Sequence, residues 1–535
     1  MRPREARSLS TLLLLCLAGG FLVRLVPALL TFLNPDEILH YLLSAQPSFA
    51  ATYQATLTTA HPPLFILFLH YWQGLGNSEF ALRLPSLLAG TAFGWVMFLW
   101  LRRISDRATA LTGLVLFLFA PALISVSAEV RQYAWLLLFC AGSLYFLERA
   151  VEDDSVSMMA FSSLVLYLAL LTHYSSLVFA LALGIYALIR LLASDAEPRM
   201  TAVWILGQLG GLAVCAYLYV SHLARLRRSP LRQEIGNTWL RTSIFHPHQD
   251  HAISFLMART VRLFRYFFSN GTIGVFALLL FLWAVALLVR AKEPSQPNRK
   301  PTPRQLALLL TLPFFIAWIT ALAGLYPYGG TRHDAVLAIF ALSGVSLGLA
   351  RLRITALWPR LALLGIALVI GNLLPFPTPP FIKLRNQNRK LMTAAVSFLR
   401  HTAPPGSTLL TDYEGGLMLS YYLCSSPVVE MKTSRPFLGS RCGDYQVLAS
   451  SPELWFYDAQ TLPSALRELQ PQQDANLGNA WLFQAGWIDE KQADWIDELG
   501  QMGCGHPRLF GHNILLCRIG TALPAEFPAA PRPGE

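Results

Sequence analysis

Charged residues are scarce in this chain. Asp, Glu, Lys and Arg make up 14% of the 535 residues, against about 25% in an ordinary soluble domain, while hydrophobic residues make up 54%. Together with a mean hydropathy of +0.45, this composition argues against a soluble enzyme and predicts a membrane protein. The formal net charge of +11 does not predict a nucleic-acid partner, because no nucleic-acid motif or basic-aromatic array accompanies it.

Other signals are missing as well. The four cysteines near the C-terminus show no C-x-x-C spacing of a zinc site. The residues after 376 contain neither a Gly-rich phosphate loop nor a nucleophile elbow. No internal repeat of the kind common in transporters is evident. The chain has instead a series of long apolar runs.

These runs are long enough to cross a membrane, which takes roughly 20 residues of helix. The first run follows MRPREAR and is too long for the apolar part of a signal peptide, so we expect a retained helix. Arg24 within it should face protein or a water-filled cavity, either in a buried ion pair or in a functional role. The sequence predicts a polytopic α-helical membrane protein with about eleven spans, at 9–33, 84–101, 108–127, 130–149, 157–173, 174–192, 201–220, 272–290, 305–325, 334–350 and 355–374.

Lys and Arg indicate how these spans are oriented. If the N-terminus is cytoplasmic, the short basic segments all fall on the cytoplasmic side, as membrane proteins require. The basic loop at 221–271 is an exception that long loops tolerate. Within it, 252–268 has the mixed Arg and apolar pattern of an interfacial helix, suited to an anionic lipid or to simple anchoring. We therefore expect a multi-pass protein of the inner (plasma) membrane. The segments that carry this argument are MRPREAR, Arg102-Arg103 with Arg107, Arg190 with Arg199, 290–304 and 351–353.

The C-terminal third reads as a separate domain. We expect residues 1–375 to form the transmembrane domain and residues 376–535 an extracytoplasmic α/β domain, which starts at the linker PFPTPP and alternates helical and strand-like patterns. Its four cysteines permit three pairings, and an oxidising compartment favours disulfides. Proximity in sequence favours Cys424 with Cys442 and Cys504 with Cys517.

Polar and ionisable residues gather in the expected outer loops. In NPDE, Asn34 and Pro35 make a good helix start and Asp36 and Glu37 suit the positive end of the helix dipole, which is a structural reading. The residues of the other loops favour the functional reading. Their cations can bind a phosphate, a carboxylate can deprotonate a hydroxyl, and their aromatic rings can pack against a sugar. The further outer-loop residues are His61, Glu79, Arg83, Glu129, Arg131, Tyr133, His173, Tyr174, Tyr326, Tyr328, Arg332 and His333.

Glu129 and Arg131 lie two residues apart, so on a continuous helix they point in different directions. A kinked or juxtamembrane helix start would let both side chains reach one cavity. The alternative is that the two charges simply neutralise each other.

Several of these motifs resemble a known family when they are taken in order. PDE after the first span, HPPL, ALRLPS, E-x-R-x-Y before a later span and THY resemble the C-type (GT-C) membrane glycosyltransferases, in the branch of protein O-mannosyltransferases and lipid A aminoarabinose transferases. The resemblance covers roughly residues 10–350 and none of the tail. It implies inverting transfer of a sugar from a polyprenyl-phosphate donor to a lipid, glycan or protein acceptor on the outer face.

The resemblance also implies roles for residues of this chain. Asp36 would be the catalytic base and Glu37 would shape the site beside it. The donor phosphate would be held by His61, Arg131, Arg332 and His333, and the substrate pocket would include Arg83, Glu129, Tyr133, His173, Tyr174, Tyr326 and Tyr328. Relatives that use a metal often show D-x-D in outer loops, and this chain has none there, so we expect metal-independent chemistry without a cofactor.

Two other classes of protein stay open at this point. A flippase or transporter of lipid-linked glycans would also carry charged groups, although these usually lie near the bilayer midplane rather than at one face. A scaffold whose outer domain binds envelope components is supported only by the size of that domain. The sequence does not indicate which sugar or which acceptor is used.

Overall fold

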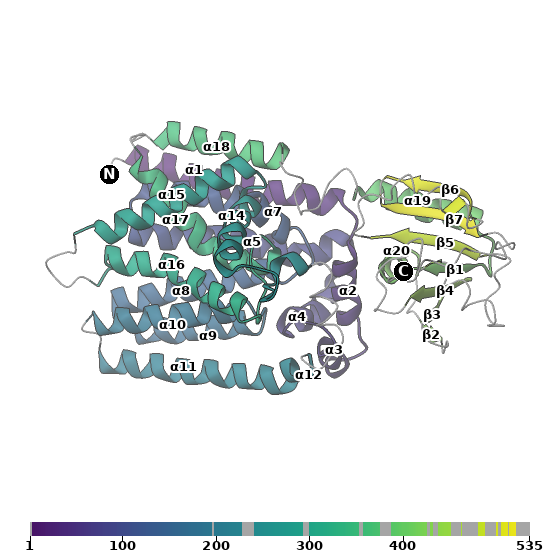
Figure 1. The fold of residues 1–535 in the computed structure, drawn as a ribbon, viewed down its shortest axis with the longest axis horizontal. Helices are drawn as coiled ribbons and strands as arrows, with labels where there is room; N and C mark the ends of the chain where they lie inside the picture. Colours follow the sequence, from purple (N-terminus) through teal and green to yellow (C-terminus); the bar gives the residue numbers. More distant parts are fainter. Residues whose placement is uncertain are drawn as a thin grey trace. The chain divides into compact units, whose positions relative to one another are not determined.

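The structure of the chain is a computed structural model, shown in Figure 1. It describes residues 3–194, 197–226, 240–292, 299–352, 357–374, 387–424, 429–431, 437–450, 462, 480–486, 499–500, 504–511 and 513–519. The chain divides into two compact units: Met1–Leu29 with Leu43–Phe381, and Leu30–Leu42 with Ile382–Glu535. The expected linker PFPTPP lies outside the described residues, and the expected domain boundary at 375 stays a prediction.

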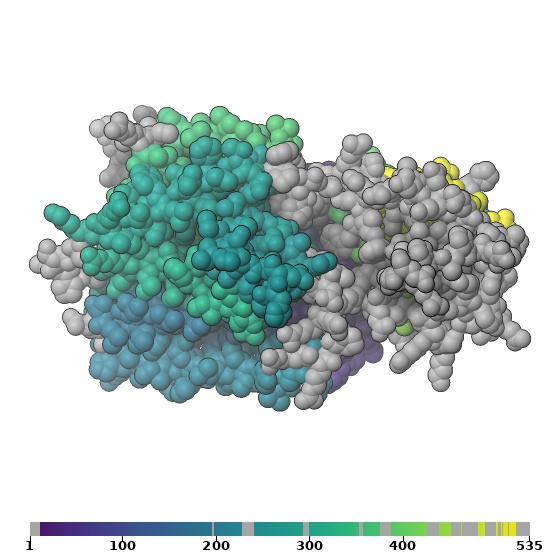
Figure 2. Space-filling model, viewed as in Figure 1, coloured from purple at the N-terminus to yellow at the C-terminus, as the bar shows by residue number. Residues whose placement is uncertain are grey.

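The first unit is helical throughout its regular elements. α18 lies along one edge of this unit and α11 along the opposite edge (Figure 1 and Figure 2). Its helices are α1 Pro3–Leu30, α3 Phe49–Thr56, α4 Leu64–Trp72, α5 Glu79–Ile104, α6 Arg107–Phe119, α7 Pro121–Ser127, α8 Tyr133–Asp153, α9 Val156–Leu170, α10 Ser176–Leu192, α11 Pro198–Leu218, α12 Ala224–Leu226, α14 Ala252–Phe268, α15 Gly271–Arg290, α16 Pro303–Leu322, α17 Ala338–Arg351 and α18 Leu357–Leu373, with the short 3-10 helices η1 Gln73–Leu75, η3 Arg241–Ser243 and η4 Arg332–Leu337 and the π-helical turn η2 Tyr219–Leu223.

Every expected span coincides with one of these helices or with a bent pair. Among the described residues, seven helices are long and apolar enough to cross a membrane, or eight if α6 and α7, which meet at a bend of 54°, form one span. Four more apolar helices are shorter, α9, α10 and α18 among them. The polytopic helical fold class is confirmed, whereas the number of eleven spans stays a prediction. The two spans expected on either side of His173 are indeed separate helices.

The expected outer loop at 34–83 is not irregular throughout. It contains α3 and α4 in the first unit, and α2 (Pro35–Ser44) begins within it. The side chain of Ser48 caps α3 by accepting a hydrogen bond from the Ala51 N–H. Helices of this length are too short to span a bilayer, so a search for apolar runs of spanning length does not detect them.

Arg24 explains how the break between α6 and α7 is stabilised. Pro121 has no N–H to donate to the Phe117 carbonyl four residues earlier, so the helix breaks there. The buried Arg24 side chain donates to the carbonyls of Leu118 (2.6 Å) and Phe117 (3.2 Å). The expectation that Arg24 faces protein is confirmed, and the partners that the structure records for it are carbonyl oxygens rather than a carboxylate.

Small residues bring α15 and α17 close together. A Cβ added at Gly344 would lie 2.4 Å from Phe281, and one at Gly348 would lie 2.7 Å from the Leu280 carbonyl oxygen. Such contacts between small residues and a neighbouring helix are a common way of packing helices in membranes. They fix the position of α17, whose first residue directly follows η4, the turn that carries Arg332.

In the second unit, residues 30–42 pair with the C-terminal part of the chain. The Phe32 N–H donates to the Gln387 carbonyl (3.0 Å), and the Leu33 N–H donates to the Tyr422 hydroxyl (2.6 Å). α2 then begins at Pro35 with Asn34 as its cap, as the NPDE pattern predicts, and the structure shows that Glu37 completes a reciprocal cap. The Glu37 N–H donates to Asn34 Oδ1 (3.0 Å), and the Asn34 N–H donates to Glu37 Oε2 (2.9 Å).

The rest of the second unit is an α/β fold, as expected. Its sheet has the order β2-β3-β4-β1-β5-β7-β6, in which β1 is parallel to β4 and β5 and the other pairs are antiparallel. Helix α19 packs against β6 and β7, and α20 packs against β4, β1 and β5. The bounds are α19 Arg389–Thr402, β1 Thr408–Thr411, α20 Tyr413–Tyr422, β2 Val429–Met431, β3 Phe437–Cys442, β4 Tyr445–Ser450, β5 Ala480–Ala485, β6 Cys504–Phe510 and β7 Ile514–Ile519.

Two disulfides join the cysteines of this unit in the pairing that the sequence favours. Cys424 pairs with Cys442 and Cys504 pairs with Cys517, with Cα–Cα distances of 4.8 and 5.6 Å. We expect both bonds in the native protein, because an extracytoplasmic domain folds in an oxidising compartment. Intact-mass analysis with and without reductant should therefore differ by four hydrogens. Four thiols that react with an alkylating reagent before reduction would contradict both the disulfides and the expected orientation.

Candidate active site

The structure brings together side chains from four connections of the first unit. His61 lies just before α4, Glu129 and Arg131 lie between α7 and α8, His173 lies between α9 and α10, and Arg332 lies in η4. Residues 128–132 form a bend rather than a helix. Both Glu129 and Arg131 therefore reach the same cluster, as the kinked start proposed from the sequence allows.

Tyr133, the first residue of α8, is at the centre of this cluster. Its side chain is buried, and its ring centroid lies 5.6 Å from Cζ of Arg131 and 6.0 Å from Cζ of Arg332. The imidazole centroids of His173 and His333 lie 5.0 and 6.2 Å from the same ring. A guanidinium within about 6 Å of an aromatic face is attracted to it, so the tyrosine ring holds the two arginines near each other.

Three imidazoles lie together beside the tyrosine, one pair stacked and the other tilted. The His173 ring lies 5.5 Å from that of His61 and 5.9 Å from that of His333, at interplanar angles of 29° and 32°. His173 Nδ1 accepts a hydrogen bond from the Ser175 N–H (3.2 Å), so the ring hydrogen is on Nε2. Burial, together with the charges of His333, Arg131 and Arg332, lowers the pKa of His173 well below its ordinary value. His173 is therefore a neutral hydrogen-bond donor near physiological pH.

The two arginines differ in their partners. Arg131 is buried, and its Nη2 lies 3.4 Å from His61 Nε2, which accepts because a guanidinium has no lone pair to offer. Arg332 is partly exposed and forms an ion pair of 3.7 Å with the buried Glu129. The cluster thus presents converging N–H donors from guanidinium and imidazole groups, with Glu129 as a carboxylate that orients one of them. Such an arrangement suits a phosphate.

The loop that carries Arg332 is fixed by two glycines and a buried acid. Gly329 and Gly330 have φ values of 108° and 82°, in the region that favours glycine. Both pack closely against α14: a Cβ added at Gly329 would lie 2.5 Å from the Arg259 side chain, and one added at Gly330 would lie 2.8 Å from the Arg262 side chain. Buried Asp334 accepts hydrogen bonds from the Gly329 N–H (2.8 Å) and the Thr331 hydroxyl (3.4 Å). Asp334 directly follows His333 but was not predicted as a site residue from the sequence.

Replacing Asp334 with Ala should loosen this loop. The buried Gly329 N–H loses its acceptor, which costs about 1–3 kcal/mol of folding free energy, and Arg332 loses its fixed position two residues away. Asp334→Asn keeps an acceptor oxygen and serves as the matched control. We expect a lower melting temperature for the alanine variant and nearly normal melting for the asparagine variant, measured in detergent. Equal melting of both variants and the wild type would exclude this role.

Several predicted pocket residues have other partners in the structure. The Tyr328 hydroxyl contacts Thr260 (2.8 Å) and accepts a hydrogen bond from Trp318 Nε1 (2.9 Å), so it belongs to the packing around α14 and α16. Arg83 is buried and donates to the Ala28 carbonyl of α1 (2.9 Å). Tyr326 lies nearer the cluster, with its ring 6.4 Å from that of His333.

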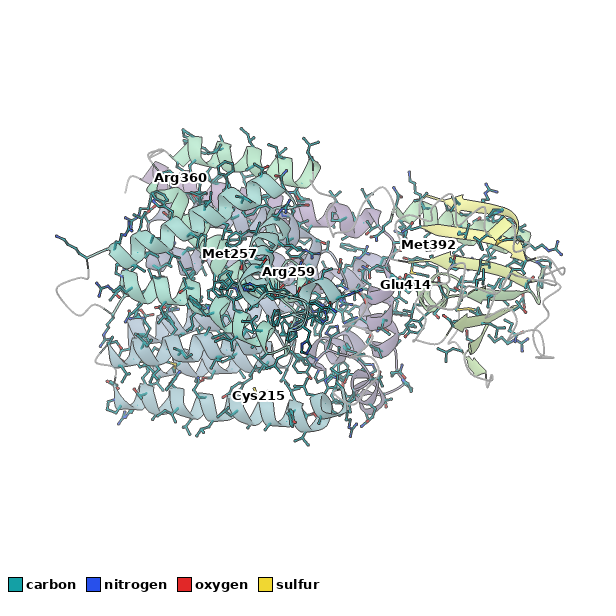
Figure 3. The ribbon with its side chains drawn as sticks, viewed as in Figure 1. Cys215, Met257, Arg259, Arg360, Met392 and Glu414 are labelled. Carbon is teal, nitrogen blue, oxygen red and sulfur yellow. A yellow bond between two sulfur atoms is a disulfide. The ribbon has the colours of Figure 1, made fainter. Side chains whose placement is uncertain are left out.

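Helix α14 supplies a site residue that sequence reasoning missed. The segment 252–268 is a helix, as expected, and Figure 3 labels its Met257 and Arg259. Buried Tyr266 near its end is close enough to Arg332 and Glu129 for their charges to influence its pKa, which burial raises above the ordinary value. The alternation of Arg and apolar residues indicated an interfacial helix, but not that one of its tyrosines lies close enough to Arg332 and Glu129 to be influenced by their charges.

The two acids of NPDE belong to the second unit. Glu37 caps α2, and Asp36 lies in the first turn of the same helix. Their assignment as catalytic residues stays a prediction. In the part of the chain that the structure describes, no group of three or more His, Cys, Asp or Glu is arranged to hold a metal ion.

Comparison with known proteins adds two findings. A family model described as dolichyl-phosphate-mannose-protein mannosyltransferase matches residues 60–220. This stretch includes His61, the Glu129–Tyr133 segment and His173, whereas Asp36 and Arg332 lie outside it. No curated protein matches the chain.

The fold is shared with ArnT from Cupriavidus metallidurans. The structure of ArnT in the apo state has a TM-score of 0.52 and 13% identity, and the match covers 95% of this chain and 98% of ArnT. The structure of ArnT bound to undecaprenyl phosphate has a TM-score of 0.53 and 13% identity, with 97% and 100% covered. The family match and the shared fold bear out the resemblance to the GT-C superfamily and indicate a membrane glycosyltransferase.

Proposed function

We propose that this protein transfers a sugar, with inversion, from a polyprenyl-phosphate donor to an acceptor on the extracytoplasmic face of the membrane. The observation that carries the proposal is the cluster around Tyr133, in which Arg131, Arg332 and three neighbouring histidines converge, in a chain with the fold of ArnT. ArnT has been solved bound to undecaprenyl phosphate, which supports a lipid phosphate as the ligand here.

The proposed chemistry takes Asp36 as the base, as the family resemblance implies. Asp36 deprotonates the acceptor hydroxyl, whose oxygen attacks the anomeric carbon of the sugar. The bond between that carbon and the phosphate oxygen breaks, and the phosphate leaves with the electron pair. The arginine and imidazole donors stabilise the negative charge that develops on the phosphate. Attack from the face opposite the leaving group, through an oxocarbenium-like state, inverts the anomeric configuration.

Binding of the lipid phosphate tests the proposal directly. The purified protein in detergent is titrated with undecaprenyl phosphate and, separately, with undecaprenol, which has the same tail without the phosphate. We expect saturable binding of the phosphate form and at least tenfold weaker binding of the alcohol, because the cluster recognises the anion rather than the tail. Equal affinity for both lipids would overturn the assignment of the cluster.

A further inference from the structure

His222 joins two loops of the first unit and has no role in the function described so far. It lies in η2, the π-helical turn that follows α11, and its side chain is buried. Its Nδ1 is 2.6 Å from the Tyr174 hydroxyl oxygen, and its Nε2 is 2.5 Å from the Thr59 carbonyl oxygen. One imidazole therefore contacts two segments that are more than a hundred residues apart in the chain.

The contacts of His222 determine where its hydrogen lies. A carbonyl oxygen only accepts, so Nε2 carries the hydrogen and donates to Thr59. In the neutral ring Nδ1 then has a lone pair and accepts from the Tyr174 hydroxyl. Both ring nitrogens are occupied by these protein partners. His222 is thus suited to hold the loops in place rather than to bind an anion itself.

Each of the two loops carries a histidine of the candidate site. The Thr59 hydroxyl oxygen accepts a hydrogen bond from the His61 N–H (3.3 Å), and Tyr174 directly follows His173. The His61 and His173 rings stack at 5.5 Å. Hydrogen bonds therefore run from Tyr174 through His222 and Thr59 to the loop of His61.

The local helix geometry around His222 also supports a functional role for this residue. Figure 3 labels Cys215 on α11, seven residues before His222. Between the two, the α-helix changes to the wider π-helical turn at Tyr219–Leu223. Such π turns are rare and occur frequently at functional sites, because they change the direction in which the following side chains point.

From these contacts we infer that His222 is a positioning residue, which holds the His61 and His173 loops at the spacing that lipid-phosphate binding needs. The inference rests on the proposed function for its consequence in binding, but the loop geometry is testable without any ligand. It predicts that removing both hydrogen bonds of His222 separates the loops and weakens binding of the phosphate, although His222 does not touch the ligand.

Three variants separate this role from simple packing. His222→Phe keeps a ring of similar size and removes both hydrogen bonds. His222→Gln provides an amide N–H for the Thr59 carbonyl and an amide oxygen for the Tyr174 hydroxyl, so it should restore much of the geometry. Tyr53→Phe is the matched control, because the Tyr53 hydroxyl also joins its segment to α11, at Tyr217 (2.6 Å), but through an exposed hydrogen bond that involves no histidine.

The variants are compared by hydrogen exchange of the full-length protein in detergent and by titration with undecaprenyl phosphate. For His222→Phe we expect faster exchange in segments 57–63 and 171–176 and roughly tenfold weaker binding, the effect of losing about two hydrogen bonds. His222→Gln should bind within about threefold of the wild type, and Tyr53→Phe should change neither readout.

Unchanged exchange in both segments of His222→Phe would overturn the inference, as would faster exchange with wild-type affinity. Faster exchange in a protein whose wild type binds no undecaprenyl phosphate would leave the loop contact standing and overturn the proposed function instead.

Discussion

Replacing Asp36 with Asn should abolish sugar transfer while leaving the protein in the membrane. The amide keeps the shape of the side chain but cannot accept a proton at neutral pH, and loss of a general base typically slows a reaction by about 10²–10⁴-fold. The substitution should not unfold α2, because the hydrogen bonds of the cap are made by Asn34 and Glu37. Transfer is measured with the purified variant in liposomes, and insertion is measured by its yield in the membrane fraction.

Glu37→Gln separates the two neighbouring acids. Gln can replace Glu in the reciprocal cap, since its side-chain oxygen still accepts from the Asn34 N–H. If Asp36 is the base, Glu37→Gln retains at least tenfold more activity than Asp36→Asn. The reverse order would move the base role to Glu37, and substantial activity in Asp36→Asn would remove Asp36 from that role altogether.

Arg332→Ala should weaken binding of the lipid-phosphate donor by roughly ten- to a hundredfold. The change removes a charged hydrogen-bonding partner, which is worth about 1.5–3 kcal/mol, and each 1.4 kcal/mol corresponds to about tenfold in affinity. It also leaves the buried Glu129 without its ion pair of 3.7 Å. The dissociation constant for undecaprenyl phosphate is the measured quantity, and the apparent affinity for the acceptor should change little.

Two companion variants sharpen this test. Arg332→Lys keeps the charge but loses the planar fork of donors, so it should bind the donor clearly more weakly than the wild type. Arg149→Ala removes a partly exposed arginine paired with Asp153 near the other end of α8, and it should bind the donor normally. The competing explanation is that Arg332 only extends to the membrane surface as a helix-end residue. Normal donor affinity in Arg332→Ala would support that explanation.

The sequence predicted the helices of the first unit well because spanning length is a local property. Runs of apolar residues of the required length are visible without knowledge of their neighbours, and the helices of the structure coincide with them. The interfacial segment 252–268 was found for a similar reason, since its pattern is carried by one helix. The short α3 and α4 were missed because no such length criterion applies to them.

The candidate site was predicted only in part. The outer-loop residues His61, Arg131, His173 and Arg332 stand out as ionisable groups at the ends of apolar runs, and the structure brings them together. Asp334, Tyr266 and His222 were missed because their roles depend on contacts between distant segments. A tyrosine or histidine in the basic segment 221–271 gives no local sign of the distant segment that it contacts. The strand order of the second unit is set by long-range pairing in the same way.

Glycan analysis in cells tests the proposed glycosyl transfer. Cells that lack the gene are complemented with the wild-type protein or with Asp36→Asn, and the glycans on envelope lipids and proteins are compared by mass spectrometry. We expect one sugar modification to disappear without the gene, to return with the wild type and to stay absent with Asp36→Asn, while the lipid-phosphate sugar accumulates. Restoration of the modification by Asp36→Asn, or an unchanged glycan profile without the gene, would contradict the proposed transfer.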